Sequence, residues 1–366
     1  MEYSDKLNGV CPYFTMFPLE FPLRILKRYA RTAESVLDPF SGRGTTNYAA
    51  RLLGMTSFGI DSSPVAFALT EAKLANATPQ SIIVSAKNIL HSASKVEVPV
   101  GDFWSSAYHA TVLEALCKLR DALLQNCRSD SRKALRGILL GALHGPVSKN
   151  TASYFSNQCT RTYAPKPGYA VKYWAERHLE PPEVDVLEVI KMKAHRYYYN
   201  QRRAKGSAFL GDSREMPVCS QIRENGVNWI ITSPPYYGMR TYLQDQWLRN
   251  WFVGGPSEII YSGNTQLDHG SPEGFASQLR IVWENVSRLA APDAKLVIRF
   301  GAIPDRSADP LLILKQSLNN SPWKLRTIKF AGSANSGRRQ ATQFALNNSE
   351  PHAEYDAWAM LRNRAN

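Results

Sequence analysis

The stretch SVLDPFSGRGT, residues 35–45, decides the fold predicted for this chain. A short apolar run ends at Asp38, two glycines follow at positions 42 and 44, and apolar residues then recur at helical spacing through residues 45–53. A strand, a glycine-containing turn and a helix in this order form the first unit of a parallel α/β sheet. The glycines let the backbone approach a ligand closely, so a binding site is predicted at this turn.

Four further apolar stretches end at a turn or polar residue, as the strands of a parallel sheet do. They are residues 55–60, 207–210, 227–231 and 295–300, and a second helical pattern covers residues 275–289. We read Pro292-Asp293-Ala294-Lys295 as a turn before the last of these strands. The alternation of strands and helices predicts an α/β fold with a doubly wound, mostly parallel sheet.

The second and third predicted strands lie far further apart than the ~12 residues that a plain crossover needs. We therefore predict an insertion at residues 78–204, between two parts of a catalytic domain at residues 1–77 and 205–366. Leucines at helical spacing predict helices in residues 111–143 of the insertion, whereas the part after residue 146 has no regular pattern.

Basic charge is concentrated in the insertion. The 366 residues include 44 Lys and Arg against 31 Asp and Glu, a net charge of +13. Residues 118–205 alone hold 17 basic and 7 acidic residues, with nine aromatic residues among them. This composition suits a polyanion with stackable bases, although a solvated basic face is an equally open interpretation.

Other classes of protein are disfavoured by what the sequence lacks. No stretch reaches the ~18 apolar residues of a membrane span, and the N-terminus does not resemble a signal peptide, so we expect a cytoplasmic protein without membrane contact. The cysteines are Cys11, Cys117, Cys127, Cys159 and Cys219. Five cysteines without a CxxC pair predict reduced thiols and no metal site.

Two acidic residues strengthen the prediction of a ligand site at the glycine turn. Asp38 at the first strand end could meet a cationic amino group, and Asp61 at the second strand end could accept from two ribose hydroxyls. Phe40 could cover the ligand. The spacing is also compatible with NAD, but the dinucleotide fingerprint has a small third residue where this chain has Asn47.

The segment TSPPY, residues 232–236, follows an apolar strand and predicts the chemistry. The two prolines make the backbone after the strand rigid. The Ser233 hydroxyl and the Pro234 carbonyl are hydrogen-bond acceptors, and Tyr236 offers an aromatic face. Two acceptors on an exocyclic amine would free its conjugated lone pair, and a stacked aromatic ring would hold the base.

Together, DPFSGRGTT, Asp61 and TSPPY resemble the amino-group S-adenosylmethionine-dependent DNA methyltransferases, which have a class I, Rossmann-like fold. The resemblance implies S-adenosylmethionine as cofactor, a flipped base as target and the tetrapeptide as the catalytic motif. Implied catalytic residues are Ser233, Pro234, Pro235 and Tyr236. Implied cofactor-binding residues are Tyr13, Phe14, Phe17, Pro18, Asp38, Phe40, Gly42, Gly44, Thr45, Asp61 and Asp212.

Serine before the Pro-Pro pair resembles the N4-cytosine branch more than the N6-adenine branch. The resemblance implies double-stranded DNA as partner and a cognate restriction endonuclease or defence-system protein as a candidate second partner. Methylation of RNA or tRNA bases, and a non-catalytic DNA-binding subunit, stay open as alternatives. As nucleic-acid contacts we predict Arg161, Lys166, Arg240, Arg338 and Arg339; residues 155–158 are further candidates.

Methylation at C5 of cytosine is disfavoured. That reaction needs a nucleophilic cysteine, usually after proline, and no Pro-Cys dipeptide occurs in the chain. Glu284-Asn285-Val286 mimics a motif of that class but lies within a helical pattern, so we interpret it as coincidence.

Overall fold

The structure is a computed structural model that describes residues 3–13, 17–92, 95–145, 153–159, 166–215, 222, 226–238, 243–259, 267, 270–301, 308–333 and 353–362. The chain divides into two compact units. The sheet unit comprises residues 13–70, 203–241 and 264–366, and the helical unit comprises residues 1–12, 71–202 and 242–263.

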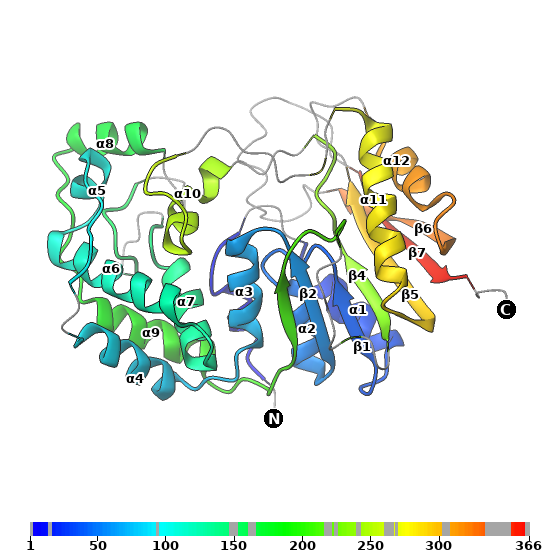
Figure 1. Cartoon of the computed structure of the whole chain (residues 1–366), viewed down its shortest axis with the longest axis horizontal. Helices are drawn as coiled ribbons and strands as arrows, with labels where there is room; N and C mark the ends of the chain where they lie inside the picture. Colours follow the sequence, from blue (N-terminus) through cyan, green and yellow to red (C-terminus); the bar gives the residue numbers. More distant parts are fainter. Residues whose placement is uncertain are drawn as a thin grey trace. The chain divides into compact units, whose positions relative to one another are not determined.

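Within the described residues, the sheet unit contains a seven-stranded sheet with the order β3-β2-β1-β4-β5-β7-β6 (Figure 1). The first five strands in this order are parallel, and β7 runs antiparallel to both β5 and β6. The winding reverses between β1 and β4, the switch point where ligands bind in such sheets. The strands are β1 Ser35–Asp38, β2 Thr56–Asp61, β3 Lys205–Leu210, β4 Val227–Thr232, β5 Ala290–Gly301, β6 Trp323–Ser333 and β7 Ala353–Leu361.

Helices cover both faces of this sheet. Val36 and Trp229 pack with residues of α1 (Glu20–Tyr29) and α2 (Thr45–Leu53). Their neighbours Leu37 and Ile230 pack instead with residues of α11 (Pro272–Ser287) and α12 (Pro310–Leu318). Because successive residues of a strand point to opposite faces, this division explains the nearly continuous apolar runs in the sequence. The predicted doubly wound, mostly parallel α/β fold is confirmed.

The turn predicted at residues 292–295 is wrong, because those residues lie inside β5. Pro292 and Asp293 are exposed. The pairing of β5 with β4 is irregular there: Val227 pairs with Ala290, whereas Trp229 pairs with Lys295. The extra residues form a bulge, which accommodates a proline without ending the strand.

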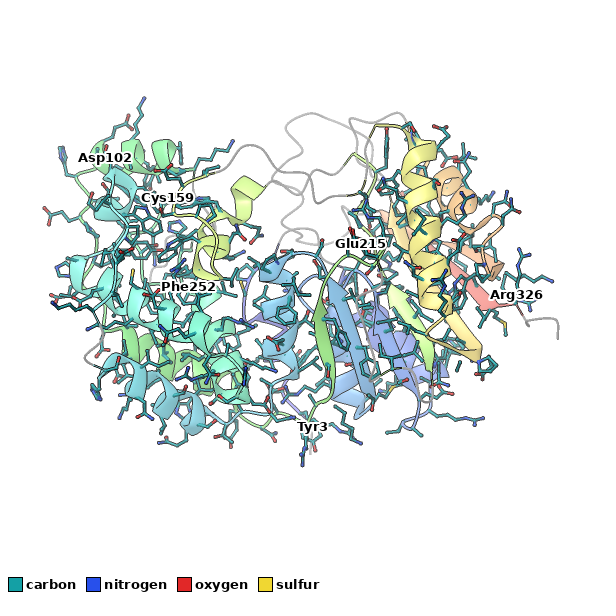
Figure 2. All side chains as sticks on the ribbon, viewed as in Figure 1. Tyr3, Asp102, Cys159, Glu215, Phe252 and Arg326 are labelled. Carbon is teal, nitrogen blue, oxygen red and sulfur yellow. The ribbon has the colours of Figure 1, made fainter. Side chains whose placement is uncertain are left out.

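The helical unit is held together by aromatic packing. The Trp104 ring lies 4.6 Å from the Trp251 ring, and the Phe103 ring lies 4.9 Å from the Trp247 ring, measured between centroids. Trp247 and Trp251 belong to α10, whose residue Phe252 is labelled in Figure 2. The elements of this unit include the 3-10 helix η1 Lys6–Gly9 and the helices α4 Pro79–Leu90, α5 Asp102–Ala107, α6 Ala110–Gln125, α7 Asp130–Leu140, α8 Pro167–Ala175, α9 Val186–Tyr198 and α10 Leu243–Phe252.

The predicted insertion is thus mainly helical, but the helical unit is larger than residues 78–204. Residues 1–12 and 242–263 also pack within it, although the sequence placed them with the catalytic domain. The aromatic residues of α10 explain the second segment, because they pack against α5. Helix α3 (Pro64–Leu74) contains the boundary between the units, after Thr70. No helix in the described ranges is long and apolar enough to cross a membrane.

Candidate active site

The loop after β1 is fixed by hydrogen bonds to its aspartate. Asp38 Oδ1 accepts the backbone N–H of Phe40 at 3.1 Å and the hydroxyl of Thr232, the last residue of β4, at 2.6 Å. The N–H of Gly44 donates to the carbonyl of Ser41 at 2.7 Å and closes the turn. The loop after β1 is therefore joined directly to the end of β4, across the switch point of the sheet.

Two glycines of this loop have left-handed backbones but different surroundings. Gly42 has φ 50°, and a Cβ built there would meet no atom nearer than the Phe40 carbonyl oxygen at 4.0 Å. Gly44 has φ 73°, and a Cβ there would lie 2.9 Å from Thr70 Oγ1 and 3.0 Å from Thr70 Cα. Gly44 thus serves the packing of α3 against the loop, whereas the space beside Gly42 is open.

Asn47 occupies the position where a dinucleotide fingerprint has a small residue. Its side chain is buried on α2, and its Nδ2 donates to Ser57 Oγ at 3.3 Å. The space for the Asn47 side chain is left by Gly59 of the neighbouring strand β2, because a Cβ on Gly59 would lie only 2.9 Å from Asn47 Oδ1. The small residue that allows helix and strand to pack closely therefore lies on the strand in this chain.

Asp38 is an electrostatically unusual carboxyl group. It is fully buried, and among the described residues its second oxygen, Oδ2, has no hydrogen-bond partner. Burial raises its pKa to about 6, and the hydrogen bonds from Thr232, Thr46 and Phe40 only partly oppose this effect. A buried carboxylate oxygen without a donor is costly, and a cationic ligand would relieve that cost.

Asp61, at the end of β2, shapes the loops around it. Its Oδ2 accepts the N–H of Gly42 at 2.8 Å, and its Oδ1 accepts the N–H of Ser63 at 2.9 Å. Burial raises its pKa, and these two backbone hydrogen bonds act in the opposite direction. Each carboxylate oxygen has two lone pairs, so both remain able to accept a further hydrogen bond from a ligand.

Asp212, in the loop after β3, is engaged by its neighbour Arg214. The guanidinium donates to both carboxylate oxygens, at 3.0 Å from Nε to each and 2.5 Å from Nη2 to Oδ2. Burial acts to raise the pKa of Asp212, but the hydrogen bonds from Arg214 outweigh it and lower the pKa. A cofactor contact at Asp212, as the resemblance implies, would have to share this carboxylate with Arg214.

The described part of the same loop, which includes Glu215 (labelled in Figure 2), is connected to the loop after β1. Ser213 Oγ donates to the Pro39 carbonyl at 2.6 Å. Asn285 of α11 donates through Nδ2 to the carbonyls of Ser213 at 3.0 Å and Arg214 at 2.7 Å. The tripeptide 284–286, which we interpreted as coincidence, thus contains a residue that holds the Asp212 loop in place.

The predicted catalytic tetrapeptide begins directly after β4. Ser233, Pro235 and Tyr236 are half-buried and Pro234 is buried. The Tyr236 ring contacts Phe300 edge-on at 5.6 Å between centroids, and its hydroxyl donates to Glu354 Oε1 at 2.9 Å. The tetrapeptide therefore follows β4 and the other loop follows β1, and these two strands are parallel neighbours in the sheet.

The aromatic segment upstream of α1 packs on the sheet. Phe17 contacts Phe21 of α1 edge-on at 5.4 Å, and the Arg299 guanidinium lies 4.0 Å from the centroid of the Phe21 ring. Tyr13 and Pro18 are half-buried. Because Phe17 joins the cluster on the α1 and α2 face, its ring has a packing role besides any contact with a cofactor.

Several predicted contact residues lie outside the described residues: Phe14, Arg161, Arg240, Arg338 and Arg339. Lys166 is exposed at the N-terminus of α8. Sequence reasoning missed three residues of the site, namely Thr232 as the partner of Asp38, Asn285 as the support of the Asp212 loop and Glu354 as the partner of Tyr236. Thr232 was recognisable as part of TSPPY, whereas Glu354 lies on a strand that the sequence analysis did not predict.

The fold and these loops define an α/β protein with two adjacent loops at the switch point of its sheet. Residues 2–72 match the family model described as DNA methylase, for N6 and N4 amino-group methylation. The chain is also similar to the Type II methyltransferase M.MjaII from Methanocaldococcus jannaschii, with 29% identity over 101 residues. That match covers 28% of this chain and 19% of the relative, so this chain spans about a fifth of the length of M.MjaII. The predicted resemblance to the N4/N6 DNA methyltransferase family is confirmed by these two matches.

Solved structures with a similar arrangement include the rRNA methyltransferase aviRa from Streptomyces viridochromogenes, with TM-score 0.38 and 10% identity over 98% of this chain and 90% of that chain. Another is a SAM-dependent methyltransferase from Agrobacterium tumefaciens, with TM-score 0.35 and 11% identity over 95% and 63% of the two chains.

Proposed function

We propose that this protein transfers a methyl group from S-adenosylmethionine to the exocyclic amine of a flipped base in DNA, cytosine N4 being the primary target. The observation that carries the proposal is the hydrogen bond from Thr232 to Asp38. It joins the candidate cofactor loop to the segment that precedes the SPPY tetrapeptide, so a bound cofactor and a bound base would meet at one edge of the sheet.

The residues present fit S-adenosylmethionine. Asp38 Oδ2 is a buried acceptor without a donor in the described structure, which suits a cationic amino group. The space beside Gly42 lets a ligand approach the backbone closely. Asp61, with acceptor capacity left on both oxygens, suits two ribose hydroxyls. Acidic groups at both strand ends favour a cationic ligand over one that carries phosphates.

When bound, S-adenosylmethionine supplies an electrophilic methyl group on a sulfonium. The Ser233 hydroxyl and the Pro234 carbonyl would accept the two N–H bonds of the exocyclic amine and direct its lone pair out of conjugation. Tyr236 would stack on the flipped base. These contributions are positioning and directed polarity, which accelerate a reaction without a covalent enzyme intermediate.

Helix α8 offers a surface suited to DNA. Ala170 and Trp174 are buried on its inner side, and Trp174 Nε1 donates to the Gln158 carbonyl at 3.0 Å. On the outer side, Lys172 is 77% exposed, and the Arg177 guanidinium just beyond the helix lies 4.1 Å from the Tyr173 ring centroid. Glu176 lies among these groups, with its carboxylate 3.8 Å from Lys172 Nζ and 3.5 Å from Arg177 Nη1. The basic residues outnumber it, and basic and aromatic groups on one solvated side suit phosphates and bases. We call Lys166, Tyr169, Lys172, Tyr173 and Arg177 the α8 surface.

The reaction product tests the proposal. Purified protein is incubated with S-adenosylmethionine and methylation-free plasmid DNA, and the nucleosides are then analysed by mass spectrometry. N4-methylcytosine is the expected product. N6-methyladenine would change the base but keep the class of enzyme, whereas 5-methylcytosine would refute the mechanism. A parallel incubation with RNA tests the RNA alternative, and a cofactor-binding protein without a methylated product in either would support a non-catalytic subunit. The restriction endonuclease or defence-system partner stays a prediction.

A further inference from the structure

Tyr236 of the SPPY tetrapeptide is held by a carboxyl group that no motif includes. Its hydroxyl donates to Oε1 of Glu354 at 2.9 Å, and only 6% of Glu354 is exposed. Glu354 lies on β7, 118 positions further along the chain. The contact therefore connects the catalytic tetrapeptide to a strand from another part of the sequence.

The sheet leaves room for this contact. Gly301 of β5 pairs directly with Glu354 of β7. A Cβ at Gly301 would lie 3.1 Å from Tyr236 Cε2 and 3.2 Å from Glu354 Cγ, closer than side chains normally pack. A side chain at Gly301 would therefore crowd Tyr236 and Glu354 where they meet at this end of β5.

The Tyr236 ring is restrained at a second point. Phe300 contacts it edge-on, and Phe300 itself stacks on Phe275 with ring centroids 6.2 Å apart. Burial, followed by the charge of Glu354, raises the pKa of Tyr236 well above its ordinary value. The charge of Arg299 and a side-chain hydrogen bond with Ser233 act in the opposite direction on this pKa. The neutral phenol donates to Glu354.

A neighbouring residue on β7 shows how this sheet stabilises a purely structural carboxylate. Asp356 accepts from Arg299 at both oxygens, at 2.8 and 2.9 Å, so its charge is compensated by a cation. Glu354 instead accepts a hydrogen bond from Tyr236, a residue of the candidate catalytic tetrapeptide. Unlike Asp356, Glu354 is therefore in direct contact with the candidate site.

We propose that Glu354 is a positioning residue that fixes the ring of Tyr236 for stacking on the target base. It acts through Tyr236 and touches neither base nor cofactor. The proposal rests on the proposed function, since it assigns Tyr236 the role of base platform.

The test compares Glu354→Ala, Glu354→Gln, Tyr236→Phe and the double variant Tyr236→Phe/Glu354→Ala. Single-turnover transfer of labelled methyl is measured with saturating S-adenosylmethionine and methylation-free plasmid DNA, and cofactor affinity is measured by calorimetry. Tyr355→Phe is the matched control, because it removes a phenol hydroxyl from the residue next to Glu354. The ring of Tyr355 packs on Phe330.

We expect Glu354→Ala and Tyr236→Phe each to lower the transfer rate about tenfold, the effect of losing one hydrogen bond to an acidic acceptor. The double variant should be no slower than the slower single variant, because both changes remove the same contact. Glu354→Gln keeps an acceptor and should stay close to the wild-type rate. Tyr355→Phe should match wild type, and cofactor affinity should not change in any variant.

Three results would overturn the inference: a wild-type rate in Glu354→Ala, losses that multiply in the double variant, or a loss in Glu354→Gln as large as in Glu354→Ala. If Glu354→Ala does not fold, the decision falls to Tyr236→Phe, where a wild-type rate refutes the inference. A wild-type protein that transfers no label to DNA refutes the proposed function itself, and with it the role of Glu354.

Discussion

The hydroxyl of Thr232 donates to Asp38 Oδ1 across 2.6 Å, and so the last residue of β4 holds the carboxyl group at the end of β1. The bond leaves Oδ2 of the same carboxyl group without a donor in the described structure. One oxygen of this carboxyl group is therefore used by the fold, and the other is the oxygen that we propose contacts a ligand.

Asp38→Asn should raise the stability of the ligand-free protein and weaken cofactor binding. Asn keeps the acceptor for Thr232 and Phe40 but removes a buried charge. The pKa of Asp38 is about 6 in the folded chain against 3.8 as its ordinary value, so the stability it contributes at low pH is lost as the pH rises through about 6. The ligand-free variant should exceed wild type at pH 8 by about 2–3 kcal/mol of unfolding free energy.

The measurement is chemical unfolding of both proteins at pH 4 and pH 8, with cofactor calorimetry at pH 8. The stability difference should be small at pH 4 and grow toward pH 8, while S-adenosylmethionine binding is weakened. If the stability difference between Asp38→Asn and wild type is the same at both pH values, burial does not raise the pKa of Asp38. Unchanged cofactor affinity would remove its Oδ2 from the binding site.

Gly42→Ala and Gly44→Ala form a matched pair, because both residues are left-handed but only one is crowded. Gly42→Ala should cost about 1 kcal/mol of stability from backbone strain and weaken cofactor binding. Gly44→Ala should cost a further ~1–3 kcal/mol, because its Cβ would collide with Thr70. Unfolding and cofactor titrations of the two variants check this order. If Gly42→Ala binds the cofactor normally, the space beside Gly42 is not where the ligand lies.

Asp61→Ala should weaken S-adenosylmethionine binding by about 1.5–3 kcal/mol for each ribose hydroxyl that it accepts. It also removes the acceptor of the Gly42 and Ser63 N–H groups, so some loss will come from the loop. Asp61→Asn retains an acceptor for one of these groups and serves as the comparison. Calorimetry with S-adenosylmethionine decides the role, and an unchanged affinity in both variants excludes Asp61 from the site.

Neutralising the α8 surface should weaken DNA binding and its dependence on salt. The variant Lys166→Gln/Lys172→Gln/Arg177→Gln removes three charges, so the log–log slope of affinity against salt should flatten by up to ~2.7. The control Lys324→Gln/Arg326→Gln/Lys329→Gln removes three exposed charges from β6. DNA titrations at several salt concentrations compare the two. An equal change in both variants would mean that α8 is not a preferred contact surface.

The part of the fold that the sequence predicted is the part built from apolar strands that end in motifs. β1, β2 and β4 are such strands, and most of their buried residues are apolar on both faces of the sheet; the buried polar residues are Asp38, Ser57 and Thr232. β7 was missed because its inward positions include Glu354 and Asp356. These buried carboxyl groups accept hydrogen bonds from Tyr236 and Arg299, and sequence spacing does not reveal those partners.

The candidate site was predicted in its motif residues but not in their supports. Glycine turns and the SPPY tetrapeptide have local signatures, because their chemistry depends on a few consecutive residues. The contacts of Asn285 and Glu354 join segments 71 or more positions apart. The role of Asn47 was equally hidden, because the compensating glycine lies on β2 rather than on the same helix.

The position of β7 has a consequence for how the protein is made. It follows β6 in the chain but lies between β5 and β6 in the sheet. During translation, the facing edges of β5 and β6 therefore stay unpaired until β7 has left the ribosome, and unpaired edges invite association with other chains. Tyr236 can contact Glu354 only after β7 has paired with β5 and β6 in the sheet. A nascent chain would thus contain the candidate cofactor loop and the SPPY tetrapeptide before Glu354 is available to Tyr236.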